Sequence, residues 1–401
     1  MKITFPLLSL FFILSCGKNA ETIITVKNSL STYRQFETVT INLEELKLSG
    51  GNESIFIEDI ETGQQLISQI VDENDDGKFD VLLFQPEMPA NSERKFYIRT
   101  GKISQESDSI AACYSRFVPE RTDDYAWENN RVAFRTYGPR AQEMIESNIK
   151  GGTLSSGIDA WLKRVEYPII NKWYKKETSS TGSYHEDTGE GLDNFHVGMS
   201  RGVGGIAKKA DSTYYISKNF TTWKTLFNGP IRTSFILEYA SWDASGKKIS
   251  EKKKISLDYG SNLSKFEITI KGTDTISAGL TLHEQDGEIA INKDYGWVSY
   301  WEPHGDSQLG TGIVVPNNAM VGYEHYVTNI QDASNLFAHI SIEDSMITYY
   351  AGFGWKKSGQ FQNKTKWNDY LQHFSEGLKN PLLVRVQYRS LKTLNESIKK
   401  N

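Results

Sequence analysis

Cysteine is scarce in this 401-residue sequence, which contains only Cys16 and Cys113. Cys16 lies at the end of an apolar leader, so Cys113 is left without a partner for an intrachain disulfide. A chain of this length can bury enough apolar surface to fold without cross-links. The scarcity of cysteine therefore excludes a small disulfide-bonded scaffold.

An excess of one charge is also absent, since 45 Lys and Arg residues stand against 50 Asp and Glu residues. Nucleic-acid-binding proteins usually carry a basic surface, so no nucleic-acid partner is predicted at a net charge of −5. No run of eighteen apolar residues could cross a bilayer. The sequence also lacks nucleotide-binding glycine motifs, the H-E-x-x-H zinc motif and the G-x-S-x-G nucleophile motif, which leaves those enzyme classes without support.

Aromatic residues are abundant: 9 Trp, 20 Tyr and 19 Phe make up 12% of the chain, alongside 32 Gly. Aromatic side chains suit pleated sheets and glycine suits turns, so an all-β fold is predicted. Short apolar or alternating runs recur along most of the chain, and the best candidate helix covers residues 366–378. We expect a small immunoglobulin-like β domain at 16–103, a linker at 104–125, and a large twisted double-sheet β-sandwich with few short helices at 126–401.

Residues 1–15 form a predicted lipoprotein signal peptide. Lys2 provides a positive start, residues 3–14 are apolar but too short to span a bilayer, and Cys16 follows a serine. This arrangement resembles the bacterial lipobox, which predicts cleavage before Cys16 and acylation of its thiol. The lipid would anchor the protein in the cell outer membrane, facing the periplasm. An ordinary secretory signal with a chance cysteine is the alternative.

Residues 72–77, DENDDG, match the first half of a calcium-binding loop, in which Asp72, Asn74 and Asp76 would supply oxygen ligands. Leu83 occupies the position of the bidentate glutamate, inside the next apolar run. The missing ligand favours an acidic hairpin turn, with a structural Ca²⁺ as the alternative. No other cofactor and no catalytic metal is predicted.

Three segments gather polar and aromatic side chains between the expected strands. Residues 163–205 interleave cations, carboxylates, histidines and aromatics among glycines, which is typical of ligand-binding loops on a β scaffold. Residues 283–304 and 349–373 combine Trp and Tyr with histidine. Such aromatics could stack on a sugar or pack in the core, because alternate strand positions point to opposite faces. The candidate site residues are Arg164, Tyr184, His185, Glu190, Asp193, His196, Arg201, Tyr300, Trp301, His304 and Trp355.

Four segments resemble one family of secreted bacterial proteins: residues 127–139, WENNRVAFRTYGP; 163–168, KRVEYP; 184–193, YHEDTGEGLD; and 228–233, NGPIRT. That family has a galactose-mutarotase-like β-sandwich and includes the ulvan oligosaccharide dehydratase of marine bacteria. The resemblance extends over about residues 20–390 and implies a carbohydrate-active lyase. Such an enzyme removes water from the non-reducing-end uronic acid of an anionic oligosaccharide and leaves a 4,5-unsaturated sugar.

Dehydration of a uronate is a β-elimination, which needs a base at C5–H, an acid at the C4 hydroxyl and a cation at the carboxylate. His185 and Tyr184 are the base and acid candidates, with His304 as a further acid. Arg201, or else Arg164, would bind the carboxylate. The remaining candidates would orient or contact the sugar: Glu190, Asp193, His196, Tyr300, Trp301 and Trp355.

Other functions remain open on the same residues. A polysaccharide lyase would use the same groups but expel a sugar instead of water. A mutarotase or epimerase would need a His–Glu pair, and its signature around the catalytic histidine is not visible. A glycosidase would need two carboxylates such as Glu190 and Glu302. A lipid-anchored glycan-binding protein would need only the aromatic residues and the small β domain.

Overall fold

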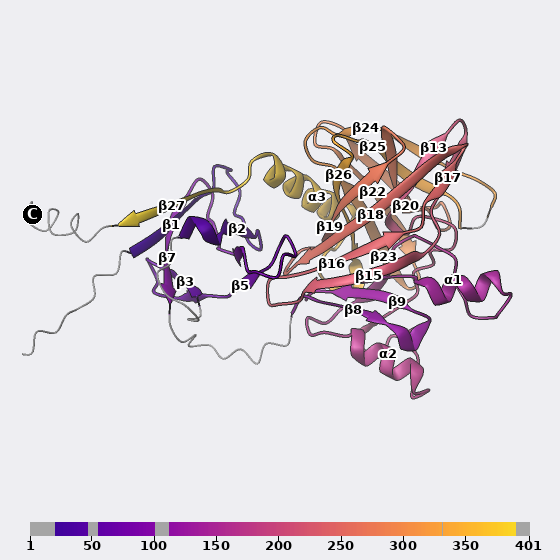
Figure 1. Cartoon of the computed structure of the whole chain (residues 1–401), viewed down its shortest axis with the longest axis horizontal. Coiled ribbons are helices and arrows are strands. Elements are labelled where there is room, and N and C mark those ends of the chain that lie inside the picture. Colours follow the sequence, from indigo (N-terminus) through magenta and orange to yellow (C-terminus); the bar gives the residue numbers. More distant parts are fainter. Residues whose placement is uncertain (1–20, 47–54, 101–111, 331, 390–401) are drawn as a thin grey trace, which may run out of the picture.

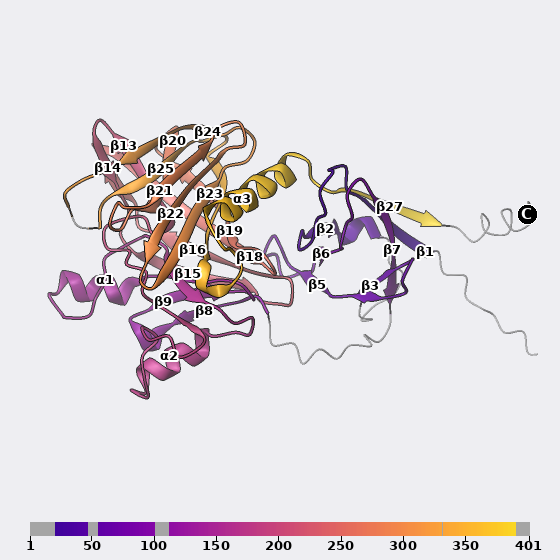
Figure 2. The same ribbon diagram turned by 180° about the vertical axis from the view of Figure 1, so that it is seen from behind.

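The computed structural model describes residues 21–46, 55–100, 112–330 and 332–389, and the predicted signal peptide and Cys16 lie outside them. The prediction of an all-β fold is confirmed, because antiparallel sheets make up most of the regular secondary structure of the described residues. Figures 1 and 2 show a small β-rich part at one end and a large sandwich at the other, with helix α3 (Lys364–Lys379) between them. No helix of the described residues is both long and apolar enough to cross a membrane.

The small part contains two sheets packed around one core. Ile24, Ile57, Phe84 and Phe96 lie in this core and are fully buried. The five-stranded sheet has the order β27 (Leu383–Arg389), β1 (Glu21–Lys27), β7 (Glu93–Thr100), β3 (Ile55–Asp59) and β4 (Gln65–Leu66). The three-stranded sheet has the order β2 (Val39–Asn42), β6 (Val81–Phe84) and β5 (Ser68–Val71), with a 3₁₀ turn η1 (Leu43–Leu46) after β2.

Near its C-terminal end the chain returns to the small part. The predicted second domain, 126–401, therefore extends too far, because strand β27 belongs to the small part. Strand β27 pairs antiparallel with β1 along its full length, from Glu21 opposite Arg389 to Lys27 opposite Leu383. Leu382 also contributes to the core of the small part. Sequence reasoning missed this pairing because strand partners distant along the chain leave no local signal.

Ending the chain at Pro381 is expected to loosen the small part without unfolding the sandwich. The truncation removes β27 and Leu382, so β1 loses its edge partner and the core loses a buried leucine. Limited proteolysis should then cut residues 21–100 faster than in the full chain. A chain ending at Arg389 is the matched control, and equal cleavage rates of the two truncated chains would contradict the assigned role of β27.

The predicted linker, 104–125, contains ordered structure in its second half. Strand β8 (Tyr114–Val118) and the 3₁₀ turn η2 (Pro119–Arg121) lie there. β8 is the edge of a five-stranded sheet, here called the site sheet, with the order β12 (Gly191–Leu192), β11 (Asp159–Lys163), β10 (Ala133–Thr136), β9 (Asp124–Glu128) and β8. The linker prediction is therefore wrong for residues 114–121, where burial does not alternate strictly along β8.

Two short helices flank the site sheet: α1 (Pro139–Glu146) and α2 (Ile170–Thr178). Helix α2 begins beside the buried Glu128, whose carboxylate accepts the backbone N–H groups of Ile169 and Ile170. A carboxylate at a helix N-terminus satisfies amides that have no partner within the helix. Lys163 balances this charge through a 2.8 Å ion pair with Glu128.

The large sandwich contains two further sheets. One has the order β14 (Thr213–Tyr215), β13 (Val203–Ala210), β20 (Thr275–Thr281), β25 (Asn335–Ser341) and β24 (Met320–Tyr326). The other has the order β15 (Phe220–Phe227), β16 (Arg232–Tyr239), β18 (Lys247–Asp258), β19 (Leu263–Lys271), β26 (Met346–Trp355), β23 (Ser307–Val314), β22 (Trp297–His304) and β21 (Glu288–Asn292), with β17 (Trp242–Ala244) paired to β18. Side chains of both sheets and of the site sheet share one buried core, as the period-2 patterning predicts.

Helix α3 confirms the helix predicted at 366–378. Asn363 caps its start by accepting the backbone N–H of Lys366, and Trp367 and Leu371 are buried beneath it. Gly310 on β23 makes room for the Trp367 ring, since a Cβ at that glycine would lie 2.7 Å from the ring. The 3₁₀ turn η3 (Lys356–Ser358) connects β26 to the segment before α3.

Candidate active site

A cavity of about 310 Å³, called the site cavity, opens beside the site sheet. Its walls come from the end of η2 and the start of β9, from the end of β10, from Thr153 and His185, and from residues 193–198 after β12. It combines cations, carboxyls, histidines and one tyrosine: Arg121, Asp124, Arg135, Tyr137, His185, Asp193 and His196. This mixture, in one pocket on a rigid sheet, is the arrangement expected of a catalytic site.

Arg135 is the central cation of the site cavity. Its guanidinium forms ion pairs with Asp159 at 2.7 Å and with Asp193 at 2.8 Å, and lies 3.5 Å from Asp124. Each of these four side chains is at most 9% exposed. With Arg121 as the next arginine, two guanidinium groups face three buried carboxyl groups, and their positive charges do not balance three negative ones. At least one of these carboxyl groups is favoured in its protonated form.

The pKa values of the three carboxyl groups follow from this imbalance. Burial raises the pKa of Asp124 to about 6, although Arg135 and Arg121 oppose the shift. Burial, together with the charge of Asp193, also raises the pKa of Asp159 well above its ordinary range. Burial raises the pKa of Asp193 as well. The site cavity is thus lined by a carboxyl group, Asp124, that can hold a proton near pH 6.

The raised pKa of Asp124 predicts how stability changes with pH. The folded protein keeps the Asp124 proton up to about pH 6, whereas the unfolded chain releases it near pH 3.8. The free energy of unfolding that this group contributes therefore falls by about 3 kcal/mol as the pH rises through that interval. Urea unfolding across the interval should show that Asp124→Asn removes this decline. Parallel curves for the wild type and the variant would contradict the assigned pKa.

Tyr184 does not line the site cavity but lies directly behind it. Its ring is 1% exposed and packs against Trp161, with ring centroids 5.0 Å apart. Its hydroxyl oxygen accepts hydrogen bonds from Arg121 Nε at 3.2 Å and Arg135 Nη1 at 3.1 Å. The prediction that Tyr184 acts directly as base or acid does not fit this burial. Tyr184 instead positions the two guanidinium groups that face the cavity.

His185 lines the site cavity, as its predicted role requires, and its side chain is 51% exposed. Its Nδ1 lies 2.6 Å from the backbone carbonyl oxygen of Asp193. A carbonyl oxygen only accepts hydrogen bonds, so Nδ1 carries the proton and Nε2 is the nitrogen that can take one. The predicted orienting role of Asp193 fits this geometry, because Asp193 holds both His185 and Arg135.

Gly191 brings the His185 segment back to the site sheet. It has φ +109°, and a Cβ there would lie 1.9 Å from the carbonyl oxygen of Leu162. Only glycine permits this approach, which lets β12 pair with β11. The backbone N–H of Asp193 then donates to the carbonyl of Tyr184 at 2.8 Å, closing the loop on itself.

Three charged residues of the predicted site lie elsewhere. Arg201 is 1% exposed and binds Ser156 Oγ and the carbonyl of Met199, and burial lowers its pKa to about 10. Arg164 forms an ion pair with Asp187. The Glu190 carboxylate binds Lys172, Tyr167 and Trp173. None of the three lines the site cavity, so their predicted contacts with substrate are wrong for this cavity.

The predicted sugar-stacking aromatics belong to the core. Tyr300, Trp301 and Trp355 are 2%, 4% and 2% exposed. The Tyr300 hydroxyl accepts the backbone N–H of Gly287, and Trp301 packs with Trp367 beneath helix α3. The stacking prediction is therefore wrong, and the rival interpretation, core packing, is correct. Strand alternation could not decide this because both faces of β22 are buried.

The remaining histidines of the predicted site lie near the cavity. His196 lines it, and its Nδ1 lies 2.9 Å from Asp332. His304 lies behind the cavity wall, where its Nε2 contacts the Asn194 side chain at 3.2 Å. Burial, and secondarily the charge of His283, lower the pKa of His304 to about 4. The His304 ring is therefore uncharged at neutral pH and does not serve as the predicted acid.

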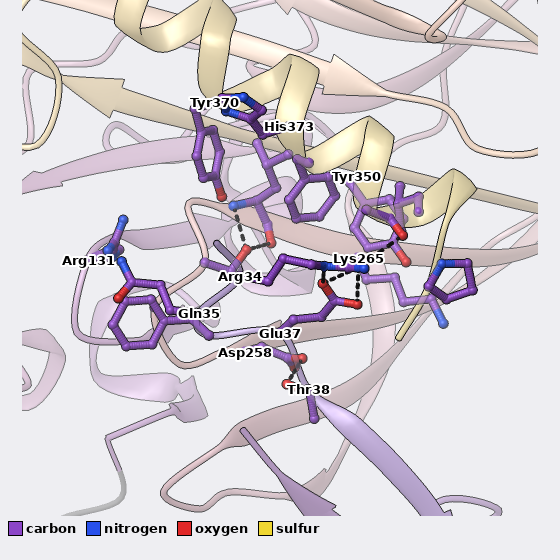
Figure 3. A pocket seen from close by; sticks show the side chains of 18 of the residues that line it. Arg34, Gln35, Glu37, Thr38, Arg131, Asp258, Lys265, Tyr350, Tyr370 and His373 are labelled. Carbon is purple, nitrogen blue, oxygen red and sulfur yellow. Dashed lines mark hydrogen bonds and ion pairs between the residues drawn. The ribbon is translucent and has the colours of Figure 1, made fainter. Parts of the chain in front are cut away.

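A larger cavity of about 730 Å³ lies where the small part, the sandwich and helix α3 meet (Figure 3). Two of its arginines are held by carboxylates of the protein itself, as Figure 3 shows for Arg34 and Glu37. Arg232 likewise pairs with Asp258, whose other contact is the hydroxyl of Thr38 in the small part. These contacts join the two parts of the molecule, so we assign this cavity to their interface.

The acidic segment 72–77 forms the turn between β5 and β6. Asp72 accepts the backbone N–H groups of Asp76 and Gly77, and Asn74 also accepts from Asp76. Asp76 in turn accepts the N–H of Lys78. These bonds are those of an acidic turn, the preferred interpretation, while the Ca²⁺ alternative stays a prediction.

Sequence reasoning missed Arg121, Asp124, Arg135 and Tyr137. Arg135 and Tyr137 lie inside the 127–139 segment that carries the family resemblance, but no spacing within the segment assigned them a role. Tyr137 donates its hydroxyl to Asp159 at 3.2 Å. The 127–139 segment did contain one signal. Arg135 is a charged residue in the otherwise uncharged strand β10, and a buried charge needs a partner.

Comparisons with known proteins now place the chain. A solved glycosyl hydrolase family 38 protein from Enterococcus faecalis superposes with a TM-score of 0.50 at 11% identity, over 92% of this chain and 47% of that one. An α-mannosidase from the same bacterium gives a TM-score of 0.48 at 11% identity, over 92% and 46%. The chain spans about half the length of these two structures. The likeness to the family 38 protein concerns the fold alone.

Closer similarity exists at the level of sequence. Uncharacterized protein P7 of Formosa agariphila is 57% identical over 378 residues, which cover 93% of this chain and 96% of that protein. The family model described as a domain of unknown function, DUF4861, matches residues 26–384. That range includes the site sheet, the sandwich and most of the small part, with only the ends of β1 and β27 inside it. The chain belongs to the DUF4861 family.

Proposed function

We propose that the protein is an oligosaccharide dehydratase, a carbon–oxygen lyase acting on the non-reducing-end uronic acid of ulvan-type oligosaccharides. The observation that carries the proposal is the position of His185. Its Nδ1 is fixed by the Asp193 carbonyl, which leaves Nε2 as the base, in a cavity that also presents two arginines and a carboxyl group of raised pKa. These groups supply the base, the cation and the acid that elimination from a uronate requires.

The proposed reaction proceeds as a β-elimination. His185 Nε2 takes the C5 proton, and the electron pair of the C5–H bond forms the C4–C5 double bond. The C4–O bond breaks, and Asp124 gives its proton to the departing hydroxyl, which leaves as water. Arg121, which forms no ion pair with a carboxylate among the described residues, neutralises the substrate carboxylate and makes the C5 proton more acidic.

The size of the site cavity favours dehydration over cleavage within a chain. Ligand pockets generally measure roughly 300–1,000 Å³, and the site cavity of 310 Å³ is at the lower end. A cavity of that size suits one terminal sugar ring better than a continuous chain. A polysaccharide lyase is the second candidate, because it would use the same base and cations but expel a glycosyl group.

Incubation of the protein with saturated, uronate-terminated ulvan oligosaccharides tests the proposal. We expect a steady rise in the ultraviolet absorbance of the conjugated C4–C5 double bond. No rise on any uronate-terminated oligosaccharide would refute the dehydratase assignment, and glycan binding without turnover would favour a glycan-binding lipoprotein. Shortened products would favour a polysaccharide lyase.

We further propose that the protein is a lipoprotein of the cell outer membrane, acylated at Cys16 and facing the periplasm. The proposal is supported by the apolar leader and the serine before Cys16, which lie outside the described residues. Mass spectrometry of the mature N-terminus tests it. An acylated Cys16 is expected, and a free amino terminus at another residue would refute the anchor.

A further inference from the structure

His283, Glu302 and His304 bring three metal-binding side chains together behind the site cavity. One ligand atom from each lies within 4.8 Å of the others. Glu302 and His304 are two positions apart on β22, so their side chains share one face of that strand. His283 follows strand β20 and reaches the same point from the neighbouring sheet.

We propose that these three side chains bind one divalent transition metal ion of the Zn²⁺ type. Two imidazoles and one carboxylate are an established ligand set for zinc, with water completing the tetrahedron. The proposal is independent of the dehydratase assignment, because it concerns residues outside the site cavity and predicts metal content rather than turnover.

Unpartnered buried atoms give the second, independent observation. Nε2 of His283 and Oε2 of Glu302 are buried and have no hydrogen-bond partner among the described residues. The Glu302 side chain is 1% exposed and the His283 side chain 11% exposed. Buried polar atoms are almost always paired, so two orphans in one cluster indicate a missing partner such as an ion.

The surroundings of His304 have the form expected around a metal ligand. Its Nδ1 lies 3.9 Å from Glu302 Oε1, toward the centre of the cluster. Its Nε2 contacts Asn194 Oδ1 at 3.2 Å. Metal-binding histidines usually donate their second ring N–H to such an acceptor, which fixes the ring. Asn194 can therefore orient His304 from the loop that forms the cavity wall.

Binding requires one small rearrangement. Nδ1 of His283 and Oε1 of Glu302 lie 2.5 Å apart and share a hydrogen bond. Two ligands of a tetrahedral zinc ion lie roughly 3.3 Å apart. A rotation of the partly exposed His283 ring opens this gap. The Phe195 ring, with its centroid 4.6 Å from that of His283, covers the cluster on the cavity side.

The metal would anchor the loop that orients the catalytic base. Asn194 and Phe195 contact the cluster, and the preceding residue, Asp193, holds His185 through its carbonyl oxygen. A bound ion at this point would hold the cavity wall in place. Its role is positional, because none of its three ligands lines the site cavity.

Zinc binding by the full-length protein tests the proposal without any substrate. The protein is stripped with a chelator, titrated with ZnCl₂ in a calorimeter, and its zinc content is measured after dialysis. We expect one zinc ion per chain and a higher thermal midpoint with zinc than without. Replacing zinc by Co²⁺ in the unmodified protein should give the intense visible absorption of tetrahedral cobalt.

Three variants locate the site. Glu302→Gln and His283→Ala should each lose the bound zinc, while His196→Ala, which removes an exposed histidine outside the cluster, should retain it. If a ligand variant fails to fold, the cobalt spectrum of the unmodified protein decides. Absence of bound zinc and of the cobalt absorption, or equal zinc content in Glu302→Gln and the unmodified chain, would overturn the proposal.

Discussion

Replacing His185 with alanine is expected to lower kcat for dehydration by roughly 100- to 10,000-fold, the usual contribution of a general base. The substitution removes the nitrogen, Nε2, that takes the C5 proton in the proposed reaction. The fold should be retained, because the side chain is 51% exposed and its hydrogen bond goes to a backbone carbonyl. Steady-state kinetics on a uronate-terminated oligosaccharide, with the thermal midpoint as a check on folding, measure the effect.

His325→Ala is the matched control for this prediction. His325 is an exposed histidine on β24 that does not line the site cavity, so its removal should leave kcat unchanged. A His185→Ala enzyme that keeps a third or more of wild-type kcat would show that another group is the base. A loss of activity in His325→Ala would show that the assay reports general damage instead.

Arg135→Met should give the largest loss of stability among the cavity residues. The arginine is the shared partner of Asp124, Asp159 and Asp193, and its removal leaves three buried carboxyl groups without their cation. Breaking a buried ion pair by deleting one partner costs about 3–5 kcal/mol. Urea unfolding at neutral pH should therefore show a free energy of unfolding lower by that amount.

The loss should shrink in acid, because protonation neutralises the carboxyl groups that Arg135 balances. Arg140→Met is the control, since Arg140 pairs with Glu143 at the surface, where both side chains are about half exposed. Such pairs contribute about 0–1 kcal/mol. Equal effects of the two substitutions would contradict the central role assigned to Arg135.

Much of the fold could be predicted from the sequence, because period-2 patterning and turn residues act locally. The helix at 364–379 was recognisable from its apolar face. The return of β27 to pair with β1 was not, since residues more than 350 positions apart share no local pattern. The strand inside the predicted linker was missed because burial along β8 does not alternate strictly from residue to residue.

The candidate site could be predicted in part. His185, Asp193 and His196 lie in one polar, glycine-rich loop, so their grouping at the cavity was readable from the chain. The sequence could not show that Arg201 is buried and not at the surface, because its burial depends on which sheet packs over it. Residues 283–304 form one polar and aromatic segment in the sequence, but the contact of Glu302 with His283 depends on the end of β20 meeting β22 in space.

The mass spectrum of a uronate-terminated oligosaccharide after incubation with the protein tests the account most directly. The account predicts a single product that is lighter by one water and keeps every sugar residue, and predicts that His185→Ala does not form it. An unchanged mass, or two fragments whose masses sum to that of the substrate, would contradict dehydration at the site cavity.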